Sequence, residues 1–241
     1  MYRRTTKDFA QGEELLRRSL NADENFVPAL CALSQAHVAR VLFGVTDDPN
    51  RQRQEAMHLA RRAIDLDRRD PLALCAMARA HLASREHDKA VPFLNSALVL
   101  NPTLAWAHYL LGVCYTYTGR TSEALPHLHA AIQLSPHDPY ASRCLTCVAE
   151  AHFFLEEDEQ AVEWAKRGLR ETATAHWSAH TVLVAALTRS GRVAEANEAV
   201  RELLVLRPDF SLSVMARSTS LTRADYLARY FQALREAGVP E

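Results

Sequence analysis

The chain has 241 residues, a net charge of −1 and a hydrophobic content of 48%, so it can bury a sizeable core. Positively and negatively charged residues are interspersed along the chain, so no extended basic surface that would attract phosphate groups is expected. Direct contact with nucleic acid is therefore not expected. No run of about 18 apolar residues is present to span a membrane, and no charged-then-apolar leader opens the chain. Five cysteines without a framework spacing suit a reducing compartment, so a cytoplasmic location is expected.

Two adjacent blocks of the sequence, 71–104 and 105–138, align without a gap. Positions in the first block fall on identical residues in the second: Ala90 on Ala124, Leu94 on Leu128, Ala97 on Ala131 and Pro102 on Pro136. A fixed period of this length is typical of a solenoid of helical hairpins. The small residues mark where two helices approach closely, and the larger apolar residues fill the space between hairpins.

The second block carries a fuller pattern: Leu111-Gly112, Tyr115, Gly119, Ala124, Leu128, Ala131 and Pro136. With these residues the chain resembles the tetratricopeptide repeat family over nearly its whole length. The resemblance implies an all-α fold, a right-handed α-solenoid of tetratricopeptide helical hairpins with a C-terminal capping helix. Such a scaffold binds other molecules, but the fold does not name its ligand.

The first segment, 1–26, is expected to be a partial repeat that contains only a second helix, from Asp8 to about Ala22. Its Gly12, Leu16 and Ser19 hold the places that Ala90, Leu94 and Ala97 hold later. We expect the polypeptide to be a fragment, or a separately encoded version, of the tail of a larger protein. The alternative is a repeat array that starts without its first helix.

The next segment, 27–70, is a repeat with an inserted loop at 43–50 (Phe43–Asn50) between helices Val27–Leu42 and Gln52–Leu66. A loop that lengthens in one repeat is either a contact site or tolerated slack. Further repeats are expected at 71–104, 105–138, 139–175 and 176–210. Asp70-Pro71 and Asp138-Pro139 are predicted to open first helices, because Asp can cap free N–H groups and Pro at the first position loses no bond.

The last segment, 211–241, is predicted to be a linker, Ser211–Ser220, followed by a capping helix from Arg223 to Ala237. The apolar stripe of that helix is spaced three and four residues apart and consists of Leu227, Tyr230, Phe231 and Leu234. Thr222 with Asp225 is predicted to start the helix, and Gly238 to stop it.

A closer resemblance is carried by three strings, YRRTTKDFAQGEELLRRSL, EALPHLHAAIQLSPHDP and DYLARYFQALREAGVPE. They are similar to the C-terminal tetratricopeptide region of bacterial multidomain regulators that carry a class III adenylate cyclase domain or a winged-helix domain. This resemblance implies a protein–protein interaction scaffold, the regulatory part of a bacterial signalling or transcription system, with such an effector domain as a partner. The chain itself contains neither effector domain, so neither activity is carried over.

Two pairs of residues offer an alternative, catalytic interpretation through a metal or a thiol. Cys144 and Cys147 form a CxxC pair inside a predicted first helix, but a zinc site needs four ligands and no second pair exists. His176 and His180 lie four apart, but the Glu of an HExxH motif is absent. We therefore expect buried thiols, no catalytic residue, no metal and no cofactor.

Histidines recur at one repeat position, where His37, His81 and His152 take the place of Tyr115. This recurrence favours a packing role, with pH sensing as the alternative. A further alternative for the whole chain is a self-assembly module that associates through its open N-terminal hairpin. The oligomeric state stays open.

The resemblance places ligand contacts in the concave groove lined by the first helix of each hairpin. The non-packing residues of those helices are the binding candidates, namely Gln35, Arg79, Trp106, Tyr109, Tyr117, Arg143, Glu150 and Arg189. Aromatic residues with arginine dominate interface energetics, although Trp106 and Tyr109 can instead pack between neighbouring repeats. The Lys and Asn clamp for acidic C-terminal peptides is not supported, because Cys75, Arg79 and Leu110 hold the matching places. The expected partner is a protein or peptide segment.

Overall fold

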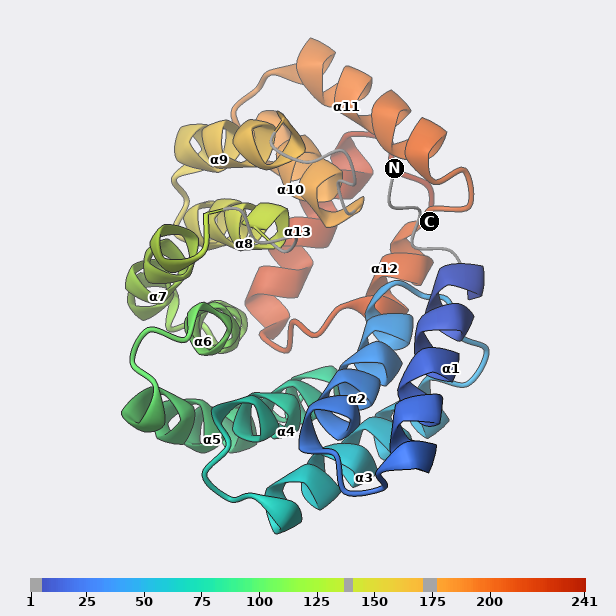
Figure 1. The fold of residues 1–241 in the computed structure, drawn as a ribbon. Coiled ribbons are helices and arrows are strands. Elements are labelled where there is room, and N and C mark those ends of the chain that lie inside the picture. The colour runs from blue at the N-terminus through green and yellow to red at the C-terminus, as the bar shows by residue number, and fades with distance from the viewer. Residues whose placement is uncertain (1–5, 137–140, 171–176) are drawn as a thin grey trace. The chain divides into compact units, whose positions relative to one another are not determined.

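The computed structural model describes residues 6–136, 141–170 and 177–241, and within these ranges the chain forms thirteen α-helices and no strand (Figure 1). The predicted all-α fold class is confirmed. The chain divides into two compact units, an N-terminal unit up to Leu110 and a C-terminal unit from Leu111, with the boundary inside one helix, α6.

The N-terminal unit begins with a single helix and continues with two hairpins of antiparallel helices. Its helices are α1 (Thr6–Ala22), α2 (Val27–Leu42), α3 (Pro49–Leu66), α4 (Pro71–Ala83), α5 (His87–Leu100) and the start of α6 (Ala105–Thr118). Leu30 and Leu33 of α2 meet Ala60 and Ala63 of α3 in the core. The small alanines allow the two helices to approach closely, as the repeat pattern predicts.

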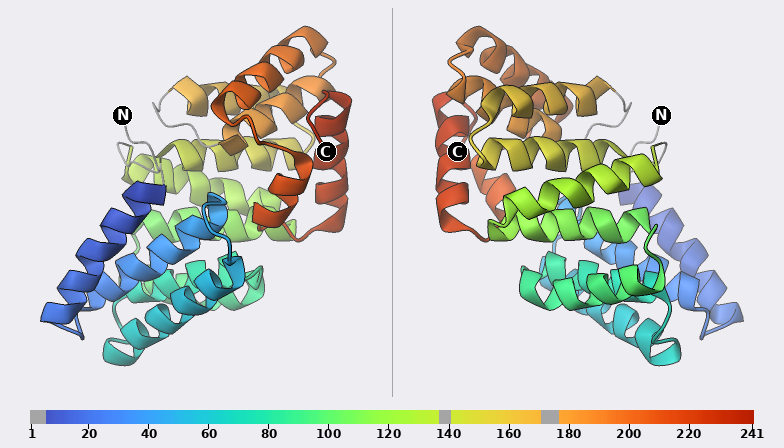
Figure 2. Two further views of the ribbon diagram at one scale, coloured as in Figure 1. Left: turned by 90° about the vertical axis from the view of Figure 1, so that its right-hand side faces the viewer. Right: turned by 90° about the vertical axis from the view of Figure 1, so that its left-hand side faces the viewer.

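The C-terminal unit contains three hairpin layers and two further helices. Its helices are the end of α6, α7 (Thr121–Leu134), α8 (Ala141–Phe154), α9 (Asp158–Arg170), α10 (Trp177–Arg189), α11 (Val193–Leu206), α12 (Leu212–Ser218) and α13 (Ala224–Glu236). Ala124 and Leu128 are fully buried, as are the matching Ala90 and Leu94 of the N-terminal unit. Figure 2 shows α13 crossing the stacked hairpins of this unit instead of lying parallel to them.

The helix caps follow the sequence where it supplies the right residue. The Asp70 carboxylate accepts from the backbone N–H groups of Leu72 and Ala73, and Pro71 occupies the first position of α4. The predicted cap at Asp138-Pro139 lies outside the described residues. At the other end, Gly238 adopts a φ of +84°, and the Val239 N–H reaches the Leu234 carbonyl, which is the Schellman arrangement predicted to stop the last helix.

Several local features differ from the predictions, among them the start of α1, which lies at Thr6 and not at Asp8. Helix α3 begins at Pro49, because Asp48 caps it by accepting from the Arg51 N–H, so Asn50 belongs to the helix and not to the inserted loop. Residues predicted as a linker form α12, which Ser211 caps through the Val214 N–H. Helix α13 has no side-chain cap from Thr222, whose hydroxyl instead donates to the Tyr117 carbonyl.

The apolar face of α13 is rotated slightly from the predicted stripe. Tyr230 and Leu234 are buried as expected, but Tyr226 and Ala233 complete the buried face, and Leu227 and Phe231 are only half-buried. The two buried tyrosines, one turn apart, both contact the Phe154 ring.

Candidate functional site

The eight candidate residues all lie on first helices, as predicted, and the structure divides them into three groups. Gln35 of α2, Arg79 of α4, and Trp106 and Tyr109 of α6 meet in the N-terminal unit; this group is called the Arg79 cluster. Tyr117, Arg143 and Glu150 meet in the C-terminal unit, and Arg189 lies apart from them on α10.

Arg79 joins three consecutive first helices. Its Cζ atom lies 5.1 Å from the centroid of the Trp106 ring, and its Nη1 atom donates a weak hydrogen bond of 3.4 Å to Gln35 Oε1. The Trp106 and Tyr109 rings pack against each other with centroids 5.1 Å apart. The cluster is therefore a guanidinium held between the amide of Gln35 and the aromatic pair Trp106 and Tyr109. These contacts are compatible both with packing of Trp106 between repeats and with a role of Trp106 in binding.

The charge of Arg79 is not balanced within the described part of the chain. The residue is only 6% exposed, yet none of the described carboxylates lies within ion-pair distance of it. Its Nε and Nη2 atoms make no hydrogen bond to any described residue, and neither is among the nitrogens sealed from solvent. Each of these donors therefore keeps some solvent-accessible area beside α2, α4 and α6.

Arg143 contrasts with Arg79, because its charge is met by a buried carboxylate. Its Nη1 atom donates to Ser178 Oγ (2.9 Å) and Glu150 Oε1 (3.4 Å), and its Nη2 atom donates to the Tyr117 hydroxyl (2.9 Å). That hydroxyl donates in turn to Glu150 Oε2 at 3.0 Å, and Glu150 is only 4% exposed. The three candidates satisfy one another, as buried polar networks in folded proteins do.

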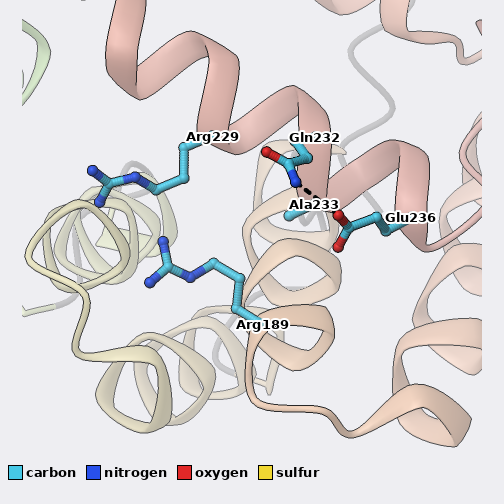
Figure 3. A pocket seen from close by; sticks show the side chains of 5 residues that line it. All are labelled: Arg189, Arg229, Gln232, Ala233 and Glu236. Atoms are coloured by element: carbon cyan, nitrogen blue, oxygen red, sulfur yellow. Dashed lines mark hydrogen bonds between the residues drawn. The ribbon is translucent and has the colours of Figure 1, made fainter.

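Arg189 is also engaged within its unit. Its Nε atom donates to Asp158 Oδ2 at 3.1 Å, and its guanidinium lies over the Phe153 ring. Burial raises the pKa of the Asp158 carboxyl, and Arg189 opposes that rise. Figure 3 shows Arg189 beside Arg229, Gln232 and Glu236 of α13, around a cavity of about 220 Å³.

The cysteine pair considered above for thiol chemistry lies in the interior of the protein. Cys144 and Cys147 are buried, and burial raises the pKa of the Cys147 thiol well above its usual range, which disfavours the reactive thiolate. Burial also raises the pKa values of Cys31 and Cys75 to about 12. The Nδ1 atom of His180 lies 3.8 Å from the Oε2 atom of Glu202, while His176 is outside the described residues. Among the residues that the structure describes, no three His, Cys, Asp or Glu side chains gather as metal ligands do.

Two of the three recurring histidines, His81 and His152, bind the turn that follows their own helix, whereas His37 Nδ1 lies 2.6 Å from Gln52 Oε1 of α3. His81 Nδ1 lies 2.7 Å from Glu86 Oε2, and His152 Nδ1 lies 2.5 Å from Glu157 Oε2. In the repeat that has Tyr115 instead, Arg120 takes the place of the acid and its guanidinium lies 4.2 Å from the ring centroid. Sequence reasoning found the recurrence but missed this matched pairing five residues on.

Sequence reasoning also missed the residues that receive α13. Thr121 and Thr181 each meet a tyrosine hydroxyl of that helix, at 3.2 Å for Tyr226 and 2.9 Å for Tyr230. The tyrosines are visible in the sequence as an i, i+4 pair, but nothing in their spacing identifies the helices that they touch.

Taken together, stacked hairpins with alanine-lined seams define an all-α array of the tetratricopeptide type. The comparisons agree with this class. The family model described as anaphase-promoting complex, cyclosome, subunit 3 matches residues 49–131. No curated protein sequence gives a match. None of the helices in the described ranges is both long enough and apolar enough to cross a membrane.

Several solved structures share the fold at low sequence identity, two of them described as TPR proteins. A chain of the APC/C hetero-tetramer Cut9–Hcn1 matches with a TM-score of 0.69 and 14% identity over 95% of this chain, which spans only 43% of the length of that chain. The thermophilic TPR protein TTC0263 from Thermus thermophilus matches with a TM-score of 0.60 and 20% identity, over 84% of this chain and 99% of that one. YrrB, described as a TPR protein with an unusual peptide-binding site, matches with a TM-score of 0.51 and 17% identity, over 74% and 90%.

Proposed function

We propose that the chain is a non-catalytic interaction scaffold that binds a protein or peptide segment at the Arg79 cluster. The observation that carries the proposal is Arg79, a residue that is 6% exposed and whose guanidinium has no carboxylate partner among the described residues. Arginine is almost never so deeply buried unless it is paired, because an unpaired buried charge is strongly disfavoured. A carboxylate on the bound segment completes the pair.

The geometry of the cluster supports a specific ligand chemistry. A planar guanidinium with free N–H groups matches the two oxygens of a carboxylate and can donate to both in parallel. Trp106, next to Arg79, offers a flat apolar face against which a neighbouring side chain of the ligand can pack. The preferred segment therefore carries an Asp, a Glu or a C-terminal carboxylate beside an apolar residue.

The wider role proposed for this scaffold is the regulatory part of a bacterial signalling or transcription system. This part of the proposal rests on the resemblance of three sequence strings to regulators with adenylate cyclase or winged-helix domains. An effector domain of one of those kinds is the corresponding partner, and the cytoplasm the corresponding location. The peptide-binding site named for YrrB supports the general role of the fold.

Selection from a random peptide display library tests the site while its natural partner is still unidentified. Wild type is compared with Arg79→Gln, which removes the charge but keeps a polar side chain. Arg61→Gln is the matched control. Arg61 is exposed on α3, so this substitution removes one positive charge, as Arg79→Gln does, but away from the cluster. Wild type and the control should enrich acidic peptides that Arg79→Gln does not retain. Equal enrichment by all three chains, or enrichment without acidic residues, contradicts the proposal.

A further inference from the structure

The last helix of the chain, α13, occupies the surface of the C-terminal unit where the first helices lie. Tyr226 stacks on Phe154 of α8, with ring centroids 4.3 Å apart and planes 9° from parallel. Tyr230 packs against Phe153 at 5.3 Å and meets the edge of Phe154 at 6.0 Å. The helix therefore sits where a bound segment is expected on a scaffold of this kind, and Figure 1 shows it beside α8 and α10.

The contacts select tyrosine and not merely an apolar side chain. The Tyr226 and Tyr230 rings are 7% and 3% exposed, and each hydroxyl meets a threonine hydroxyl, Thr121 at 3.2 Å and Thr181 at 2.9 Å. Phenylalanine at position 226 would leave the buried Thr121 hydroxyl without its partner, which is unfavourable. Phenylalanine at position 230 would remove the bond to Thr181, whose hydroxyl also donates to the Ser178 carbonyl. Two tyrosines one helical turn apart are thus recognised by shape and by hydrogen bonding.

Charge adds a third recognition element on the flank of the helix. Arg229, three residues after Tyr226, lies with its Nη1 atom 2.8 Å from Glu156 Oε1, at the turn between α8 and α9. A helix that presents Tyr, Arg and Tyr at positions i, i+3 and i+4 therefore complements this surface in both polarity and charge.

The packing of α13 against the hairpins leaves a cavity along the side of the helix that carries Arg229. Arg229, Gln232 and Glu236 border the cavity of about 220 Å³ next to Arg189 in Figure 3. The carboxylate that pairs with Arg189, Asp158, has its Oδ1 atom sealed from solvent without a hydrogen-bond partner. The connection between α12 and α13, Thr219–Arg223, has no regular structure, and Leu221 is its buried anchor. A helix attached through a short irregular segment beside such a cavity can leave its seat without dismantling the hairpins.

We propose that this surface, formed by Thr121, Phe153, Phe154, Glu156 and Thr181, is a docking site for a partner's amphipathic helix with the Tyr-x-x-Arg-Tyr pattern, and that α13 is its resident occupant. A partner helix of the same chemistry binds when α13 is released. The site is separate from the Arg79 cluster and has a different ligand, so it stands or falls independently of the proposed function.

The first experiment offers the helix in trans to the full chain. The probe is a fluorescently labelled peptide of residues 222–241, and the receptor is either wild type or the double variant Tyr226→Ala, Tyr230→Ala, which loosens the tethered helix but keeps the docking surface. The tethered helix competes at an effective concentration of order millimolar, so the variant should bind the peptide at least about tenfold more tightly than wild type does. A peptide with the same two substitutions is the control and should not bind.

Equal binding of the probe by both chains would overturn the proposal, as would a variant whose circular dichroism shows that the hairpins themselves have unfolded. Hydrogen exchange on wild type gives a second test that needs no variant. The amides of α13 should exchange through local opening, at least about tenfold faster than those of α8 and α10. Exchange of all three helices at one common rate would make α13 an inseparable part of the fold. A wild-type dimer held by exchanged α13 helices would overturn the choice of a partner's helix as the occupant.

Discussion

Replacing each of two arginines by methionine separates a structural charge from a binding charge. Arg143→Met removes the charged partner of Glu150, a carboxylate that is 4% exposed and keeps the hydrogen bond from the Tyr117 hydroxyl. Breaking a buried ion pair from one side costs about 3–5 kcal/mol, and the lower end applies because the Arg143 side chain is itself 23% exposed. At a few degrees per kcal/mol, the unfolding midpoint of the C-terminal unit should fall by roughly 10 °C.

Arg79→Met has a different expected outcome, because no described carboxylate depends on Arg79. The change loses the contact with Trp106, worth about 1 kcal/mol, and a long hydrogen bond to Gln35, and it removes a charge that was unfavourably buried. These effects oppose each other, so stability should stay within about 1 kcal/mol of wild type.

Urea and thermal unfolding followed by far-ultraviolet circular dichroism measure both variants. Two transitions can appear, because repeat arrays do not always unfold as one cooperative unit, and each is then fitted separately. A loss of stability in Arg79→Met as large as that in Arg143→Met would refute the reasoning, because it would show that Arg79 is held in a structural network of its own.

Three further predictions concern local features. Arg85→Gly should stabilise the chain by about 1 kcal/mol in urea unfolding, because Arg85 has a φ of +62°. Gly112→Ala should destabilise the chain by about 1–3 kcal/mol, since a Cβ atom at this position would lie 2.4 Å from Leu128 Cδ2. Gly12→Ala should instead stabilise α1, because a Cβ atom there would have open space around it. Burial lowers the pKa of His180, so the unfolded chain binds more protons, and stability should fall as the pH drops below about 6.5; His180→Gln should show a smaller fall in thermal midpoint.

Each of these three predictions would be contradicted by one specific result. A destabilised Arg85→Gly would show that contacts of the arginine side chain outweigh its backbone strain. Equal effects of alanine at Gly112 and Gly12 would show that Leu128 moves aside freely. An acid-induced fall in midpoint of the same size with and without His180 would place the responsible protons elsewhere.

The repeat period predicted most of the fold because each hairpin buries the same few positions. Ala90 and Ala124 lie 34 residues apart and are both fully buried, so a local pattern is enough to identify them. The helix α12 was missed because seven residues, less than two full helical turns, are too short a stretch to show a period. The cap at Asp70 was predictable since its chemistry acts within three residues.

The candidate site was predictable only as far as the choice of helix face. The sequence places both Arg79 and Arg143 on first helices, and spacing alone treats them alike. Their difference depends on contacts with residues 26 to 44 positions away, such as Tyr117 for Arg143 and Gln35 for Arg79. The same limit hid the seat of α13, because Tyr226 and Thr121 are 105 residues apart.

The most direct test of the interaction scaffold is the affinity of the best selected peptide for wild type and for Arg79→Gln, measured by isothermal titration. Loss of a charge-assisted pair of hydrogen bonds should weaken binding by at least about tenfold, while the exposed control Arg61→Gln should bind as wild type does. Equal affinity for wild type and Arg79→Gln would contradict the assignment of the Arg79 cluster as the binding site.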